Sequence, residues 1–334
     1  MRPKYRAGKA EDIELLYKCF VDNADDIDQE HYAIVKHEWE ILISNPTTMT
    51  MIVEDADCAD SFIAVGQAVF VTEKFAEFAC QGLPFWINAR LTEPLPDDSW
   101  PLMNYEEVAR ANATTGVIGV LCRWDVHRRF SPEVALKLRH EMQRWFEKFS
   151  RGYNYKEIWV EATGPGPKEE ALRAGFHVID DYQRYARQLP DDPEFHPCLL
   201  RLTREEALLQ PSSLASYAFA YTPPLANFTR RQKEILQLAL DKVNDKEIAK
   251  RLHFGDSTIN KEWLKIYEHA HERLPVEIPA REDRKRGPER RGPLLAYLEN
   301  HLEELRPYDA SPLTIEKLVK SARIRKSKTR VSRS

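Results

Sequence analysis

Apolar residues recur at helical spacing in three short runs between residues 228 and 267, and polar residues separate the runs. The repeated apolar positions are Ile235, Leu236, Leu238 and Ala239 in the first run, Ile248, Ala249 and Leu252 in the second, and Ile259, Trp263 and Ile266 in the third. Residues three, four and seven positions apart lie on one face of a helix. The pattern therefore predicts three short helices that bury their apolar faces against one another.

Residues with capping chemistry stand where these helices are expected to begin. Thr229 and Asn244 each have a Gln or Glu three residues on. The side-chain oxygen of such a cap accepts a hydrogen bond from the first helical turn, and the Gln or Glu can return one. For the third helix either Asp256 or Ser257 can serve as the cap. The caps predict the start of each helix independently of the apolar pattern.

The other face of the third helix is polar. It carries Ser257, Thr258, Asn260, Lys261, Glu262 and Lys265. Such side chains contact phosphates and base edges when a helix enters the major groove of DNA. We interpret residues 228–275 as an all-α helix-turn-helix domain. The alternatives are a three-helix packing unit that binds no nucleic acid and the related helix-turn-helix of sigma factors.

This segment resembles the LuxR (GerE-type) helix-turn-helix of bacterial transcription regulators. The matching residues are Phe228-Thr229, Glu234-Ile235-Leu236, Lys246-Glu247-Ile248-Ala249, Arg251-Leu252, Ser257-Thr258-Ile259 and Ile266-Tyr267. The resemblance implies that residues 257–267 form the recognition helix. The DNA contacts that it implies are Ser257, Thr258, Asn260, Lys261 and Lys265, with Arg230 and Arg231 on the first helix.

Three residues depart from the LuxR pattern. The family usually has a basic residue where Asn260 stands, a His or Asn where Glu262 stands, and a polar residue where Leu264 stands. Glu262 can accept a hydrogen bond from a cytosine amino group, but a carboxylate near phosphates is otherwise unfavourable. These departures bear on base preference more than on fold.

Upstream, residues 4–189 alternate helical and strand-like segments. Helices are expected at 10–23, 31–44, 132–149 and 168–174, and strands at 49–54, 62–72, 115–124, 157–162 and 177–187. The segment 75–113 shows no clear period apart from a helix at 105–111. A β-α-β-α-β order behind two helices and a hairpin predicts an α/β domain over residues 1–189.

This domain resembles the GNAT acyltransferase superfamily. The resemblance is carried by residues 5–13, by residues 62–68, by the strand-helix pair 117–149, and by Ala174-Gly175-Phe176 before the last strand. It implies a mixed sheet with flanking helices. In active members a glycine-bearing turn before the long helix holds the pyrophosphate of acetyl-CoA on bare backbone N–H groups. The resemblance thus makes acetyl-CoA, or another acyl-CoA, the cofactor to test.

The corresponding turn in this chain, residues 127–133, contains no glycine. Pro132 lacks an N–H group, and Glu133 adds negative charge where a pyrophosphate would lie. Ser131 followed by proline is instead an ordinary helix start. Arg128, Arg129 and Ser131 are the residues that can still attract an anion. We therefore expect a domain that does not catalyse acetyl transfer.

The GNAT resemblance also implies a tyrosine as general acid and a carboxylate or water on the central strands as general base. Tyr182 and Tyr185 stand near the first position, and Glu161 or Asp125 near the second. None of the four is marked by its spacing, and a packing or surface role is the alternative for each.

Proline residues punctuate residues 190–227, which we interpret as a linker with a short helix at 204–210. Residues 276–322 are expected to form a basic hinge, with its charged residues at 280–292, and accessory helices. Their apolar stripe at Leu294, Leu298, Leu302 and Leu305 predicts a helix that either mediates a homodimer or packs on its own domain. A last helix is expected at 314–322. The tail, 323–334, has six basic residues and no acidic one, so it is expected to be disordered and able to lie along phosphates.

The distribution of charge also separates residues 225–334 from the rest of the chain. Residues 225–334 hold 25 Lys and Arg against 17 Asp and Glu, a net charge of +8, while the chain as a whole carries -4. A basic segment on an acidic body is typical of a DNA-binding module attached to another domain. Five scattered cysteines without metal-ligand spacing, no membrane-length apolar run and no signal peptide favour a cytoplasmic protein without a metal site.

The sequence therefore predicts an α/β GNAT-like domain that senses a ligand or partner, joined to an all-α domain that binds double-stranded DNA. The function expected is transcription regulation. An active N-acyltransferase tethered through its C-terminal module is the alternative.

Overall fold

The computed structural model describes most of the chain and divides it into two compact units. The described residues are 2–16, 29–57, 62–81, 87–127, 129–185, 187, 189, 191–192, 196–210, 214–279 and 287–311. Unit 1 comprises Met1–Ala111, Thr115–Ser150 and Asn154–Ala220, and unit 2 comprises Asn112–Thr114, Arg151–Tyr153 and Tyr221–Ser334. The helix expected at 314–322 and the basic tail lie outside the described residues.

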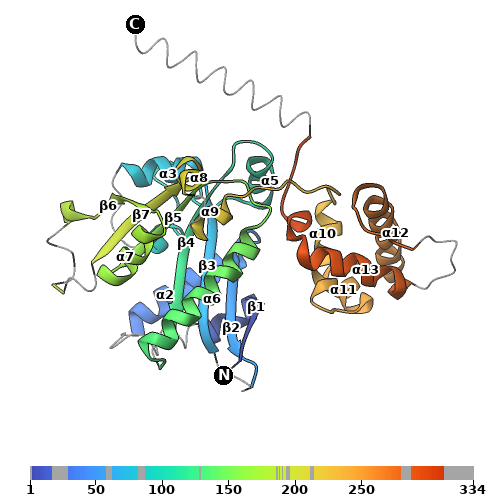
Figure 1. The fold of residues 1–334 in the computed structure, drawn as a ribbon, viewed down its shortest axis with the longest axis horizontal. Helices are drawn as coiled ribbons and strands as arrows, with labels where there is room; N and C mark the ends of the chain where they lie inside the picture. The colour runs from blue at the N-terminus through green and yellow to red at the C-terminus, as the bar shows by residue number, and fades with distance from the viewer. Residues whose placement is uncertain are drawn as a thin grey trace, which may run out of the picture. The chain divides into compact units, whose positions relative to one another are not determined.

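The described part of unit 1 is built on a seven-stranded mixed sheet (Figure 1). In spatial order the strands are β1 (Pro3–Ala7), β2 (Met49–Asp55), β3 (Phe62–Val71), β4 (Val117–Val126), β5 (Tyr155–Thr163), β7 (Pro197–Thr203) and β6 (His177–Asp180). All neighbours pair antiparallel except β4 and β5, which are parallel. A parallel pair needs a crossover, and the long helix α6 (Pro132–Ser150) provides it.

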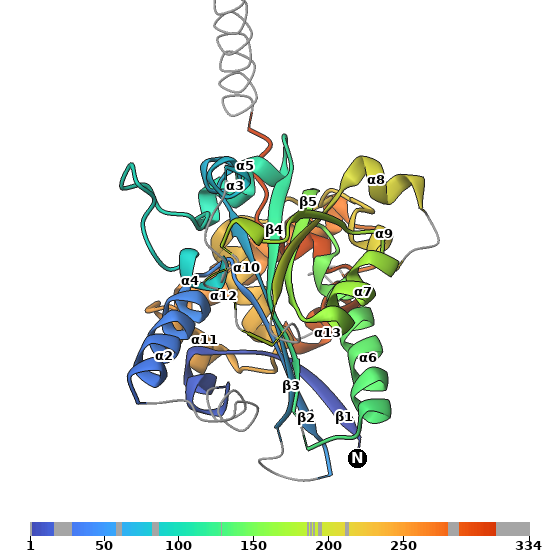
Figure 2. The same ribbon diagram turned by 90° about the vertical axis from the view of Figure 1, so that its left-hand side faces the viewer.

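Helices cover both faces of this sheet. Besides α6 they are α2 (Gln29–Ser44), α3 (Glu73–Cys80), α4 (Ile87–Arg90), α5 (Tyr105–Asn112), α7 (Pro165–Arg173), α8 (Arg204–Leu209) and α9 (Leu214–Ala218), with the short helices η1 (Ala10–Asp12) and η2 (Gln183–Tyr185). Leu138 and Met142 of α6 pack on Ile63 of β3, whereas Phe75 of α3 packs on Val69. Figure 2 shows α6 on one side of the sheet and α2 and α4 on the other. Because both its faces are covered, β3 is buried along its whole length.

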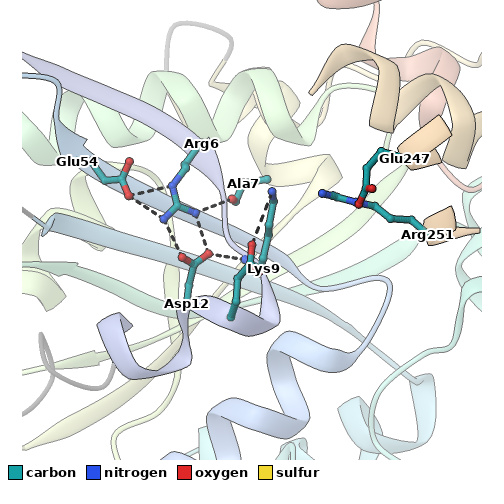
Figure 3. A network of polar contacts seen from close by, with 8 residues as sticks. Arg6, Ala7, Lys9, Asp12, Glu54, Glu247 and Arg251 are labelled. Carbon is teal, nitrogen blue, oxygen red and sulfur yellow. Dashed lines mark hydrogen bonds and ion pairs between the residues drawn. The ribbon is translucent and has the colours of Figure 1, made fainter. Parts of the chain in front are cut away.

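An ion cluster fastens the first strand (Figure 3). Arg6 of β1 donates to both carboxylate oxygens of Asp12 at 2.7 Å and to Glu54 of β2 at 2.7 and 2.9 Å. Burial raises the pKa of Asp12, but the hydrogen bonds from Arg6 and from the backbone N–H of Lys9 outweigh it, so that the pKa lies below its usual value. The contacts join β1, η1 and β2 through a single side chain.

Unit 1 differs from the sequence prediction at its ends and in its middle. The segment 190–227, predicted as a linker with one short helix, contains that helix as α8 and also contributes the inner strand β7 and the helix α9. The first strand, β1, was not predicted, and the segment 75–113 contains α3 and α4 besides the expected helix α5. The last predicted strand, 177–187, ends at Asp180 and gives way to η2. The fold class, a mixed α/β sheet with flanking helices, agrees with the prediction.

Unit 2 is all-α over its described residues. Its helices are α10 (Arg230–Leu240), α11 (Asp245–Arg251), α12 (Asp256–Arg273) and α13 (Gly287–Asn300), followed by the short helix η5 (Leu302–Leu305). Ile235, Ile248, Ile259, Ile266 and Leu294 are fully buried in their common core. The three apolar runs thus form one core, as predicted.

The predicted helix starts hold for two helices and fail for the third. Thr229 accepts a hydrogen bond from the backbone N–H of Gln232, whose side chain returns one, and Asn244 accepts from the N–H of Glu247. Neither Asp256 nor Ser257 caps α12, since its cap is Gly255, which has no side chain to bond. The fourth helix begins before the predicted hinge ends, at Gly287, and its leucine stripe continues into η5.

Buried polar groups hold η5 in unit 2. The Glu304 carboxylate accepts from the backbone N–H groups of Leu225 and Ala226, both at 2.9 Å, and Lys233 Nζ donates to the carbonyl of Arg306 at 2.6 Å. Asn112 Nδ2 donates to the carbonyl of Pro307 at 2.9 Å. Asn112 thus belongs to unit 2, although it precedes the main segment of that unit, Tyr221–Ser334, by more than one hundred positions.

Candidate functional site

The first candidate is the turn before α6, the position at which a GNAT enzyme would hold pyrophosphate. The backbone N–H of Phe130 donates to the carbonyl of His127 at 3.2 Å, and that of Arg129 donates to His127 Nδ1 at 3.2 Å. The N–H of His127 itself donates to the carbonyl of Ile63 at 2.9 Å. Three N–H groups of the turn are thus used within the fold. Arg128 lies outside the described residues.

The helix start that follows is also satisfied internally. Ser131 Oγ accepts from the N–H of Val134 at 3.4 Å, so Ser131 is the N-cap that the sequence predicted. The guanidinium of Arg129 donates to the carbonyl of Phe62 at 2.7 Å and lies 4.9 Å from the ring centroid of Phe130. Glu133 pairs with Lys137 at 2.8 Å on the exposed first turn. The residues described at this turn do not fit a pyrophosphate, because the backbone N–H groups of His127, Arg129 and Phe130 are bonded within the protein and a carboxylate stands beside them.

The structure brings together two of the predicted catalytic residues. Tyr182 Oη donates to Glu161 Oε1 at 2.7 Å, and the backbone N–H of Ile87 donates to Glu161 Oε2 at 3.0 Å. Tyr182 is fully buried and has a left-handed backbone with φ of 56°. Burial, followed by the charge of Glu161, raises the pKa of the Tyr182 phenol strongly. A phenol that holds its proton so firmly is poorly matched to general acid chemistry near neutral pH.

Tyr185 occupies a different place from Tyr182. It lies in η2, half-buried against the edge of the core, with the guanidinium of Arg184 5.2 Å from its ring centroid. Its backbone N–H donates to the carbonyl of Tyr182 at 2.8 Å. Its main contacts are thus those of a packed turn residue.

The helix α4, which contacts the Tyr182–Glu161 pair through Ile87, was not predicted from the sequence. Strands β4 and β5 pair only as far as Leu121 and Val160, and Cys122 stands at a register shift between β3 and β4. Asn88 of α4 donates to the carbonyl of Cys122 at 2.9 Å. Together with the Ile87–Glu161 bond, this contact fixes α4 beside the diverging strands. No periodic signal marks α4, because it is a single turn of helix.

The second candidate is the solvent-facing side of α12. Ser257, Asn260, Lys261 and Lys265 are all exposed, and Thr258 is half-buried. Leu264 is 38% exposed on the same side. The opposite side buries Ile259, Trp263, Ile266 and Tyr267. All but one of the polar residues that the sequence assigned to a DNA-contacting face therefore keep some exposure on one helix.

Glu262 is the exception. It is buried, 7% exposed, and accepts from Lys265 Nζ at 3.1 Å, with Arg231 of α10 at 3.9 Å. Its assignment to the polar outer face was wrong. Glu262 lies three residues after Ile259 and four before Ile266, so the helical period already contained this information. The Glu262 carboxylate, expected to add a negative charge to the DNA-contacting face, is instead buried and paired with Lys265 and Arg231.

The two arginines of α10 belong to local contacts as well. Arg230 pairs with Glu234 at 3.1 Å, and Arg231 lies 4.6 Å from the ring centroid of Phe254. Both side chains remain about half exposed, at 48% and 51%. Exposed pairs of this kind are weak and can be exchanged for a phosphate at little cost.

Two arginines of α13, placed by the sequence in a charged hinge, cover the aromatic side of α12. Asp245 accepts from Trp263 Nε1 at 3.1 Å and from Arg291 at 2.8 Å. The guanidinium of Arg291 lies 4.1 Å from the Trp263 centroid, and that of Arg290 4.4 Å from the Tyr267 centroid. These contacts hold α11, α12 and α13 together, and no spacing in the sequence indicates them.

Comparisons with known proteins concern the fold alone. No family model and no curated protein matches the chain. Among similar solved structures, the C-terminal condensation domain of Ebony in complex with beta-alanyl-dopamine is 12% identical, with 61% of this chain and 99% of that chain covered and a TM-score of 0.40. The dodecameric spermidine N-acetyltransferase of Vibrio cholerae is 11% identical, covering 63% and 98%, with a TM-score of 0.34.

A predicted acetyltransferase of Clostridium acetobutylicum, solved with acetyl-CoA, is 13% identical over 54% of this chain and 93% of that chain, with a TM-score of 0.32. These structures are similar to this chain in fold. Among the described helices, none is long and apolar enough to cross a membrane.

Proposed function

We propose that the protein is a DNA-binding transcription regulator in which α12 enters the major groove of a duplex. The observation that carries the proposal is the exposed row Ser257, Asn260, Lys261 and Lys265 on the side of α12 opposite its buried row. The net charge of +8 over residues 225–334 supports it, since phosphate neutralisation drives such binding. Glu262, a carboxylate that the sequence placed on this face, is buried and does not oppose phosphate contact there.

In this proposal unit 1 is a sensor and not an enzyme. The turn before α6 uses its donors internally, and the Tyr182 hydroxyl is bonded to Glu161. Neither group is available as it stands for pyrophosphate or for proton transfer. A ligand or partner of unit 1, and a homodimer through α13, stay predictions of the sequence.

The test is duplex binding by the full chain. The full chain is needed because Asn112 and Arg151 bond to the η5 region, so a fragment beginning at residue 225 would lose these contacts. Affinity is measured by fluorescence anisotropy against salt concentration. Lys261→Ala is expected to weaken binding and to reduce the salt slope by about 1.

The matched control is Lys148→Ala on α6, which removes an equal charge from an exposed helix of unit 1. It should leave both affinity and slope unchanged. Absence of salt-dependent binding to any duplex, or equal losses from the two substitutions, would show that α12 is not a DNA-contacting helix.

A further inference from the structure

The exposed face of α12 has two chemically different halves. An α-helix turns by about 100° per residue, so Asn260 and Leu264 lie to one side of Ser257, and Lys261 and Lys265 lie to the other. All five residues are exposed. One half offers an amide and an isobutyl group, and the other offers two ammonium groups.

The lysine half is suited to phosphates. Among the described residues, no carboxylate forms an ion pair with Lys261, while Lys265 bonds Glu262 and still has 59% of its side chain exposed. An ammonium group on a flexible stem acts as a point charge, which positions a protein on the DNA backbone without reading sequence. Base preference must therefore come from the other half.

Asn260 has the chemistry to read adenine. Its amide offers one donor group and one acceptor, and adenine presents an N7 acceptor beside an N6 donor in the major groove. Guanine presents two acceptors there, so the carbonyl of Asn260 would face an acceptor and stay unbonded. The amide thus favours adenine over guanine.

Leu264 adds an apolar group to the same half of the face, four residues after Asn260. It is 38% exposed on a face that is otherwise polar. The thymine methyl group is the apolar feature of the major groove and is recognised by apolar contact. Four residues of helix span about 6 Å, which is roughly two base steps of about 3.4 Å.

We propose that Asn260 and Leu264 give the bound duplex a preference for two A·T pairs, one or two steps apart, with adenine opposite Asn260 and a thymine methyl beside Leu264. This inference rests on the proposed function. It assigns base preference to Asn260 and Leu264, two of the three positions where the chain departs from the LuxR pattern, and it assigns backbone contact to the lysines.

The experiment is selection of duplexes from a random library by the full-length protein at one fixed salt concentration. The wild type is expected to prefer adenine to guanine at one position by about 5- to 150-fold. Asn260→Ala should abolish that preference, Asn260→Arg should shift it to guanine, and Leu264→Ser should relax the neighbouring A·T position. Gln237→Ala, an exposed amide on α10, is the control and should keep the wild-type motif.

Two failures are distinguishable. A selected motif without the A·T pairs, or one that Asn260→Ala leaves unchanged, overturns the inference while duplex binding stands. Enrichment of no duplex, together with no salt-dependent binding, overturns the proposed function and the inference with it. Equal unfolding midpoints for the wild type and the variants exclude a folding defect as the cause of a changed motif.

Discussion

The turn before α6 and the exposed face of α12 were both candidates for anion binding. They differ in how far their polar groups are bonded within the protein. At the turn, Arg129 bonds the carbonyl of Phe62 and the backbone N–H groups bond His127. On α12, Asn260 and Lys261 are exposed to solvent. The two regions thus differ in whether their polar groups are used for the fold.

This difference shows why residue type alone does not define a binding site. A donor already bonded within the protein gains little by exchanging that bond for a ligand, whereas an exposed donor exchanges only water. Arg129 and Lys261 are both basic and both exposed, but Arg129 is tied to the carbonyl of Phe62 through one of its guanidinium nitrogens, whereas no carboxylate of the described residues forms an ion pair with Lys261.

The largest effect is expected from the support of α12. Trp263→Ala removes a buried ring that packs under Arg291 and bonds Asp245. We expect a loss of about 3–5 kcal/mol in the free energy of unfolding of unit 2, with loss of duplex binding. Thermal or urea unfolding of the full chain measures it. Trp100→Ala, at a 43% exposed site, should change stability by less than about 0.5 kcal/mol; similar losses at both sites would contradict the assigned core.

The second prediction concerns the buried lysine of unit 2. Burial lowers the pKa of Lys233 from 10.5 to about 8, and Glu304 opposes that shift. Below pH 8 both folded and unfolded states are protonated, and burying the ammonium costs about 3 kcal/mol. Between pH 8 and about 10.5 the unfolded state binds more protons, so the stability of unit 2 rises with pH across this window.

Lys233→Met removes this titration. Urea unfolding of the full chain at several pH values, read by hydrogen exchange in peptides of α10, should show the wild type gaining about 3 kcal/mol relative to Lys233→Met between pH 8 and 10.5. Lys250→Met, at an exposed lysine of α11, should follow the wild type. Parallel curves for Lys233→Met and the wild type would show that Lys233 does not titrate as proposed.

Local chemistry predicted local structure well in this chain. The Thr229 cap, the Ser131 cap and the apolar stripes of α10 and α12 all follow from residues within one or two turns of each other. β7 was missed because prolines surround it, although Pro197 is tolerated as the first residue of a strand. Its place between β5 and β6 depends on residues far away in sequence.

Tertiary contacts account for what the sequence did not predict about the candidate sites. The Arg129 guanidinium donates to the carbonyl of Phe62, which lies far away in sequence. The Glu161 carboxylate accepts from the backbone N–H of Ile87, which belongs to a one-turn helix. Residue spacing carries no information about such partners. Sequence could nominate Tyr182 and Glu161, whereas only the structure shows that they bond each other.

The third prediction tests that bond, with a smaller expected effect. Tyr182→Phe removes the hydroxyl that donates to Glu161 at 2.7 Å. We expect a loss of about 1–3 kcal/mol in the unfolding free energy of unit 1, because an oxygen of the half-buried Glu161 carboxylate loses a donor. Tyr217→Phe, at a 58% exposed tyrosine, is the matched control and should have no measurable effect. Unchanged stability in Tyr182→Phe would remove the structural role assigned to the pair.

The smallest expected effect is that of acetyl-CoA, for which we predict none. A ligand that binds only the folded state raises its stability, by about 2.7 kcal/mol at one hundred times its dissociation constant. The backbone N–H groups of His127, Arg129 and Phe130 are already bonded, and Glu133 repels a pyrophosphate, so millimolar acetyl-CoA should leave the unfolding midpoint unchanged and give no saturable heat in calorimetry. Glu133→Gln removes that charge without supplying a donor cradle, and it too should show no binding. Saturable heat in the wild type that is lost on Arg129→Ala would show that the turn rearranges to bind the ligand. It would support the alternative that the protein is an active N-acyltransferase.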